Sequence, residues 1–128
     1  TGHQEVVKVN FNPQIISYRD LLDSYWINID PFDDNGQFCD RGDSYKPIIF
    51  TSNEEQERQA KESKQNISLA LNIPLDQFKV EILDSKTFWI AEKYHQDFAV
   101  RNRLKYNFYR TSCGRDNRLK KVWGDYKK

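Results

Sequence analysis

The first part of the chain changes from a strand-like to a helix-like spacing of apolar residues. In EVVKVNF, residues 5–11, apolar and polar positions alternate, which predicts a half-buried strand that ends at the next Asn-Pro turn. Ser17, with Asp20 three residues later, then forms a partial capping box. The spacing beyond it predicts an amphipathic helix that stops at Pro31, with an apolar face made of Tyr18, Leu21, Leu22, Tyr25, Trp26 and Ile29.

The rest of the chain predicts short strands separated by helices. Ser52, followed three residues later by Glu55, is a second capping signature. After residue 46 the pattern predicts a strand at residues 47–51, a long polar helix from Ser52 to about Asn72, and a strand at residues 80–83. Shorter helices are predicted at residues 88–98 and 117–126, and the second of them ends at Gly124. This order indicates an α+β fold, a two-layer sandwich in which helices cover a small mixed sheet.

Composition supports a single domain, residues 1–128, because the chain is 38% hydrophobic and 30% charged. No apolar run approaches the roughly 18 residues that a membrane span needs, and the first residues lack the pattern of a secretion signal. Two cysteines in such a chain predict free, reactive thiols in a reducing compartment rather than a disulfide scaffold. We therefore expect a cytoplasmic protein with no membrane partner.

The chain contains no methionine, so either its initiator was removed or it is the later part of a longer chain. The predicted strand begins four residues after Thr1 and has no preceding partner. We therefore expect a chain that is truncated at its N-terminus.

Charge is distributed unevenly along the chain. Residues 99–128 hold ten Lys or Arg against Asp116 and Asp125, so this basic tail carries +8 and residues 1–98 carry −7 of the net +1. The tail also interleaves aromatic residues, as in RLKYNFYR, which would suit phosphates and stacked bases. Charge alone does not identify a partner. We favour a solvated tail packed over an acidic body, and expect no nucleic-acid partner.

One loop concentrates residues that carry chemistry. FCDRGDSYKP, residues 38–47, follows the turn-forming DPFDDNG and holds a thiol, two carboxylates and a tyrosine. The loop connects a predicted helix to a predicted strand, at a sheet edge where binding sites are commonly built. Cys39, Asp40, Asp43 and Tyr45 are the candidate residues.

Four segments together resemble the C-terminal two-thirds of a peptide methionine sulfoxide reductase A. They are TGHQEVVKVNFNPQIISYRDLL, GQFCDRGDSYKPIIF, AEKYHQDF and SCGRDNRL, and the likeness runs in order from Thr1 to about Trp123. The resemblance implies a sandwich of the ferredoxin-like type, here without its first strand and helix. In that family the nucleophilic cysteine lies upstream of the TGH motif. This chain lacks that segment, so the resemblance implies that the segment could associate with the chain.

The same resemblance assigns roles to site residues. Glu5 matches the glutamate that gives a proton to the sulfoxide oxygen, and Tyr45 matches a tyrosine that hydrogen-bonds that oxygen. Asp40 matches an aspartate that binds the substrate backbone, while His3 and His95 lie in motifs that line the site and support its hydrogen bonds. Asp43 has no matching role, and we interpret it as a surface carboxylate.

Alternatives remain open for the two cysteines. Cys39 stands where many family members carry asparagine, and it could be a resolving thiol, a metal ligand or a small buried residue. Cys113 lies where the family commonly places the resolving thiol, and it is otherwise a passive cysteine. Position favours Cys113 as the resolving thiol, because a glycine and a charged tail follow it. With His3 and His95 the cysteines lack the spacing of a zinc site, so we expect no metal.

Two functions are compatible with these residues. The resemblance implies reduction of methionine sulfoxide, the S epimer at sulfur, free or in proteins, with recycling by thioredoxin and no bound cofactor. This reading implies protein repair under oxidative stress. The alternative is a non-catalytic remnant that binds methionine sulfoxide or a partner, because the nucleophile is absent.

Overall fold

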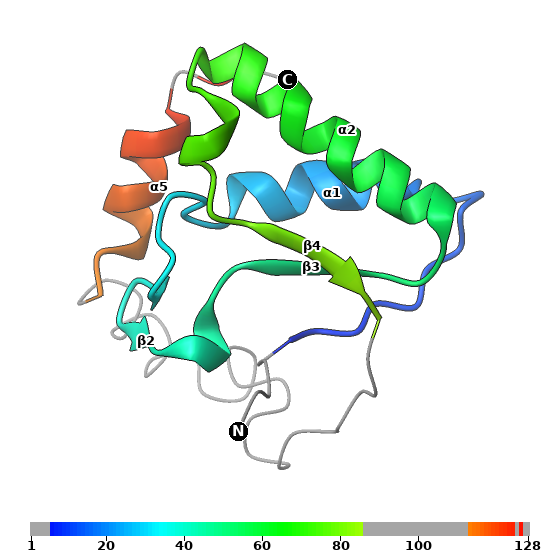
Figure 1. The fold of residues 1–128 in the computed structure, drawn as a ribbon, viewed down its shortest axis with the longest axis horizontal. Helices are drawn as coiled ribbons and strands as arrows, with labels where there is room; N and C mark the ends of the chain where they lie inside the picture. The colour runs from blue at the N-terminus through cyan, green and yellow to red at the C-terminus, as the bar shows by residue number, and fades with distance from the viewer. Residues whose placement is uncertain (1–5, 86–112, 125, 127–128) are drawn as a thin grey trace.

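A computed structural model describes residues 6–85, 113–124 and 126, which form two packed helices, short strands and a third helix from the end of the chain (Figure 1). The helix predicted at residues 88–98 lies outside the described residues. So do three predicted site residues, His3, Glu5 and His95.

The two main helices begin and end close to where their capping residues predict. Helix α1, Tyr18–Ile27, has Ser17 as its N-cap with both hydrogen bonds of a capping box to Asp20. Helix α2, Glu54–Leu71, is capped by Asn53, one residue after the predicted cap Ser52, because the Asn53 side chain accepts the hydrogen bond from the Gln56 backbone. Asn72 ends α2 in the left-handed conformation, which asparagine tolerates well.

The predicted strands at residues 47–51 and 80–83 are present and pair with each other. Strand β3, Ile48–Thr51, runs parallel to β4, Glu81–Asp84, with Ile49 opposite Ile82. Helix α2 and the short 3-10 helix η2, Leu75–Gln77, connect them, and α2 packs on both strands and on α1 (Figure 1). The coarse expectation of a small sheet with helical cover is thus confirmed.

The core lies between α1, α2 and the β3–β4 pair. Trp26 of α1 is fully buried and meets the Phe78 ring edge to face, with 6.5 Å between ring centroids. Its indole N–H donates a 3.0 Å hydrogen bond to the buried Ser63 hydroxyl of α2. The other buried apolar side chains are Leu22, Ile49, Ala60, Ile67, Val80 and Trp123.

The strand predicted at residues 5–11 is wrong for the part that the structure describes. Residues 6–12 have no regular secondary structure, and Val7 and Val9 are 85% and 55% exposed. A strand needs a neighbouring strand for its hydrogen bonds, and no described strand pairs with this segment. Alternation in the sequence was therefore insufficient to make a strand here.

A small antiparallel hairpin was missed in the sequence. Strand β1, Gly36–Gln37, pairs with β2, Asp40–Arg41, and the 3-10 helix η1, Asp43–Tyr45, follows. The described strands therefore form two separate two-stranded sheets instead of one mixed sheet.

Candidate active site

Helix α5 brings the end of the chain back to the loop that carries the candidate residues. This helix, Arg115–Trp123, follows the predicted segment 117–126 closely and ends at Gly124 as expected. Trp123 is buried, and its indole N–H donates a 2.9 Å hydrogen bond to the Ile29 carbonyl oxygen. The basic tail thus contributes a packed helix to the core.

Asp30 connects α5 to the loop. Its carboxylate, in a residue only 7% exposed, accepts hydrogen bonds from the Arg118 guanidinium at 2.7 and 3.3 Å and from the Phe32 backbone N–H at 3.1 Å. The Gln37 side chain bonds both backbone groups of Asp30, at 2.7 and 2.9 Å. Because a buried charge requires partners, Asp30 holds α5 through Arg118, and it also bonds β1 through Gln37.

The close pairing of β1 with β2 requires a glycine at position 36, the first residue of β1. A Cβ atom added to Gly36 would lie 2.2 Å from the Asp40 backbone oxygen, and the φ of Gly36 is +147°. Phe38, at the turn itself, also has a positive φ of 56°. This tight geometry positions Cys39 at the tip of the hairpin, where it is exposed.

Cys39 and Cys113 form a disulfide, with 5.2 Å between their Cα atoms and a sequence separation of 74. The expectation of free thiols is therefore wrong, because the fold of α5 against the loop places the two sulfur atoms together. The readings of Cys39 as a buried residue or a metal ligand are wrong as well, since it is exposed and its sulfur is bonded to Cys113. Within the described residues, no three His, Cys, Asp or Glu gather in a way that could hold a metal ion.

Two arginines flank the disulfide. The Arg115 guanidinium lies 4.2 Å from the centroid of the Phe38 ring, and it donates a 3.1 Å hydrogen bond to the Asn28 carbonyl oxygen. Arg41 bonds the Asp33 carboxylate, with Nη2 3.1 Å from Oδ1, and lowers the pKa of Asp33 below its usual range. Arg115 therefore joins α5 to Phe38, the residue before Cys39.

Asp40 and Tyr45 lie close to the disulfide along the chain. Asp40 follows Cys39 directly and pairs with Gln37 in the hairpin, and both Asp40 and Tyr45 are half-buried. The Tyr45 backbone N–H donates to the Gly42 carbonyl oxygen at 3.1 Å, which closes η1. Of the predicted site residues, Cys39 and Asp40 lie in the hairpin and Tyr45 lies in η1, which follows it. Cys113 lies two residues before Arg115, the first residue of α5, and is bonded to Cys39.

Sequence reasoning missed the residues that hold this arrangement. Asp30, Arg115 and Arg118 were not singled out, although Arg115 lies in the SCGRDNRL segment that supported the family resemblance. Asp30 and Arg118 are 88 residues apart, so their ion pair has no local signal in the sequence.

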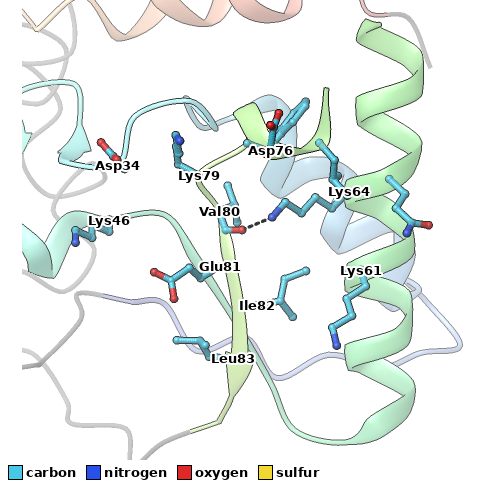
Figure 2. Close-up of a pocket in the computed structure, with 13 residues that line it drawn as sticks. Asp34, Lys46, Lys61, Lys64, Asp76, Lys79, Val80, Glu81, Ile82 and Leu83 are labelled. Atoms are coloured by element: carbon cyan, nitrogen blue, oxygen red, sulfur yellow. Dashed lines mark hydrogen bonds between the residues drawn. The ribbon is translucent and has the colours of Figure 1, made fainter. Parts of the chain in front are cut away.

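The cavity in Figure 2 is lined by other residues. It is open, has a volume of about 720 Å³, and lies between α2 and β4. Lys64 reaches across it and donates a 2.8 Å hydrogen bond to the Val80 carbonyl oxygen, and burial lowers the pKa of Lys64. Its charged lining is mixed: Lys46, Lys61, Lys64 and Lys79 with Asp34, Asp76 and Glu81. Among the described site residues, neither Cys39, Asp40, Tyr45 nor Cys113 lines this cavity.

The described helices, the parallel β3–β4 pair and the Cys39–Cys113 disulfide define an α+β protein with paired cysteines. The family described as peptide methionine sulfoxide reductase matches residues 1–127. The chain is 47% identical to "Peptide methionine sulfoxide reductase MsrA 2" of Caulobacter vibrioides, over 97% of this chain and 62% of that protein. It is 44% identical to "Peptide methionine sulfoxide reductase MsrA/MsrB" of Vibrio cholerae, over 97% of this chain and 32% of that protein. The chain therefore belongs to the peptide methionine sulfoxide reductase family.

A solved structure supports the same assignment. Mxr1 from Saccharomyces cerevisiae in reduced form is 26% identical and superposes with a TM-score of 0.66, over 73% of this chain and 50% of that chain. The chain thus spans about half of that protein and 62% of the Caulobacter relative. No helix among the described residues is both long and apolar enough to cross a membrane.

Proposed function

We propose that this chain is the larger part of an enzyme that reduces the S epimer of methionine sulfoxide, free or in proteins, to methionine. The observation that carries the proposal is the Cys39–Cys113 disulfide directly beside Asp40, in a chain of this family. Such a disulfide is the oxidised product expected after thiol-based reduction of a sulfoxide. The proposal includes no bound cofactor or metal.

In the proposed chemical step, a cysteine thiolate from an upstream segment attacks the sulfoxide sulfur while Glu5 donates a proton to the oxygen. The oxygen is transferred to the thiolate, so the cysteine becomes a sulfenic acid and methionine leaves. Tyr45 hydrogen-bonds the oxygen as it gains charge, and Asp40 binds the substrate backbone. His3 and His95 support the hydrogen bonds of the site.

In the proposed recycling step, Cys113 acts first and Cys39 second. The Cys113 thiolate attacks the sulfenic acid, which releases water and forms a disulfide with the nucleophile. The Cys39 thiolate then attacks the Cys113 sulfur, so the nucleophile is released as a thiolate and the Cys39–Cys113 disulfide forms. Thioredoxin reduces that disulfide. The pairing supports a role for both cysteines, where position in the sequence favoured Cys113 alone.

The proposal includes the architecture and setting of the complete enzyme. We propose a single ferredoxin-like domain in which an upstream strand and helix, together with the nucleophile, complete residues 1–128. Residues 99–128 form its basic C-terminal part, of which α5 is the described helix. Repair of oxidised protein in the cytoplasm is the proposed setting.

The test uses an enzyme in which the upstream nucleophile segment is joined to this chain. Cys39→Ser and Cys113→Ser should each still form about one methionine per enzyme without reductant, because neither thiol attacks the sulfoxide. Each should lower thioredoxin-dependent turnover by roughly tenfold or more, since recycling is blocked. Unchanged recycling in both variants would contradict the proposal.

The alternative is that these 128 residues alone bind methionine sulfoxide or a partner without reducing it. It is favoured by one observation: the chain has two cysteines, and both are in the disulfide. The isolated chain should then show no turnover with dithiothreitol. Turnover at an ordinary enzyme rate, roughly 1 s⁻¹ or more, would exclude this non-catalytic alternative.

A further inference from the structure

Helix α5 is held to three consecutive residues, 28–30, which follow α1 directly and which we call the anchor segment. Three side chains of α5 donate hydrogen bonds to it, one to each of its residues: Arg115 to Asn28, Trp123 to Ile29 and Arg118 to Asp30. The first two bonds, of 3.1 and 2.9 Å, go to backbone carbonyl oxygens. The third contact is the pair of bonds, of 2.7 and 3.3 Å, from the guanidinium to the buried carboxylate.

Short connections link the anchor segment to both cysteines. On one side, the Gln37 side chain bonds the backbone N–H and carbonyl groups of Asp30, and Gln37 precedes Cys39 by two residues. On the other side, Gly114 alone lies between Cys113 and the first residue of α5. The φ of Gly114 is +70°, in the left-handed region that favours glycine. The place of α5 on the anchor segment therefore bears directly on the distance between the two sulfur atoms.

The contacts between α5 and the anchor segment do not require the disulfide. None of the three involves a sulfur atom, and Trp123 is buried in the core, so apolar burial also holds the helix. Two thiols that a fold holds close together react with each other far more readily than two that must meet by diffusion, because little further entropy is lost. Of the three contacts, the Asp30–Arg118 pair depends most on its partner, since a buried carboxylate without a cation is costly.

We propose that Asp30 and Arg118 are positioning residues for recycling. Their ion pair keeps α5 on the anchor segment when the disulfide is reduced, and so keeps the Cys113 sulfur within reach of Cys39. This inference rests on the proposed function, in which Cys39 displaces the nucleophile from Cys113. In that step the Cys39 thiolate forms a bond to the Cys113 sulfur, the bond from Cys113 to the nucleophile breaks, and the nucleophile leaves with the electron pair as a thiolate. Asp30 and Arg118 act through the position of Cys113 and take no part in the bond changes.

The equilibrium with glutathione measures this positioning in the 128-residue chain. Two glutathione thiols reduce the disulfide to the two cysteine thiols and become one glutathione disulfide, and the equilibrium gives the effective concentration of the cysteine pair. We expect Arg118→Gln and Asp30→Asn each to lower this effective concentration by about tenfold or more. Arg118→Lys keeps the charge but loses the two-pronged geometry, so it should lie between wild type and Arg118→Gln. A value for Arg118→Gln within about twofold of wild type would overturn the inference.

Two control variants separate positioning from a general loss of stability. Asn53→Ala removes the cap of α2, and Lys121→Gln removes one positive charge from an exposed position of α5. Both should stay within about twofold of wild type, because a loss of stability common to the oxidised and reduced chains cancels from the equilibrium. If Asn53→Ala lowered the effective concentration as much as Arg118→Gln, the ion pair would have a purely structural role and the inference would fail.

The double variant with Asp30→Asn and Arg118→Gln covers the case in which a single variant does not fold. It leaves no buried charge without a partner, and circular dichroism checks its helix content in both redox states. Because both substitutions remove the same contact, its effective concentration should also lie about tenfold below that of wild type. A double variant with the effective concentration of wild type would overturn the inference.

Hydrogen exchange tests whether α5 stays in place after reduction. In wild type reduced with a phosphine, the backbone amides of α5 should remain nearly as protected as in the oxidised chain, because the contacts to the anchor segment persist. In reduced Arg118→Gln the same amides should exchange about tenfold faster or more. Loss of protection in reduced wild type would show that the disulfide alone holds α5, which would overturn the inference.

Failure of this inference is distinguishable from failure of the proposed function, because these measurements use no sulfoxide. An unchanged effective concentration in Arg118→Gln would remove the positioning role and leave recycling through Cys39 and Cys113 intact. Recycling that continues in both Cys39→Ser and Cys113→Ser would instead contradict the proposed function, whatever the glutathione equilibrium shows.

Discussion

At the residue scale, paired charges hold the loop that carries the candidate site. Asp30 is buried against Arg118, and Asp33 binds Arg41 on the surface of the hairpin. The first pair joins two distant segments, and the second joins residues eight apart. Exposed pairs contribute little to stability, so we expect the Asp30 pair to matter more for the fold and the Asp33 pair mainly for its pH dependence.

Asp33 should make the free energy of unfolding depend on pH in the acidic range. Its hydrogen bond from Arg41 lowers its pKa in the folded chain below the unfolded value of about 3.9. Its stabilising contribution is therefore fully present above the unfolded pKa and is lost as pH falls through the lowered folded-state pKa. Urea unfolding should show wild type more stable than Asp33→Asn at about pH 6, with the difference shrinking toward about pH 2.

The matched control for Asp33 is Asp34→Asn, at the exposed neighbouring residue. It should leave the pH dependence close to that of wild type. If the difference in free energy of unfolding between wild type and Asp33→Asn stayed constant with pH, the carboxylate would act by its shape and not by its charge.

At the element scale, local signals predicted the helices better than the strands. Ser17 and Asp20 form the expected capping box, and α1, α2 and α5 end within a few residues of the predicted positions. Helices depend on contacts within a few residues, which the sequence displays directly. The hairpin at residues 36–41 was missed, because strands of two residues are too short to show an alternation of apolar and polar positions. The strand predicted at residues 5–11 is wrong for residues 6–11, since no described strand pairs with them.

Helix α2 provides a direct test of its cap. Asn53 accepts the hydrogen bond from Gln56 N–H at 2.8 Å, so Asn53→Ala should lower the free energy of unfolding by about 1 kcal/mol. Urea unfolding followed by circular dichroism measures it.

Two controls accompany the cap variant. Asn66→Ala, at an exposed position inside α2, should be neutral or slightly stabilising because alanine has the higher helix propensity. Ser52→Ala separates the observed cap from the predicted one, and it should have little effect. If Ser52→Ala were the destabilising variant, Ser52 and not Asn53 would be the cap in solution.

At the scale of the whole molecule, long-range contacts join the last described helix to residues 29–39. Helix α5 meets the segment after α1 through Trp123, Arg118 and the disulfide (Figure 1). These contacts span 74 to 94 residues, so only the folded backbone reveals them. This is why the sequence identified Cys39 from the composition of its loop and Cys113 from a family resemblance, but did not pair them.

The disulfide should also stabilise the domain, because it closes a long loop. The segment between Cys39 and Cys113 contains β3, α2 and β4, the central elements of the described core. Closing a loop of 74 residues restricts the unfolded chain, and the chain-entropy estimate for that restriction is about 4 kcal/mol. Reduction with a phosphine should therefore lower the free energy of unfolding by about this amount, measured by urea unfolding.

The control is the double variant with Cys39→Ser and Cys113→Ser. Its free energy of unfolding should equal that of the reduced protein and should not change when the phosphine is added. A loss below about 1 kcal/mol on reduction would mean that the unfolded chain already keeps α5 near the loop, or that the native disulfide is destabilising enough to cancel the entropic gain.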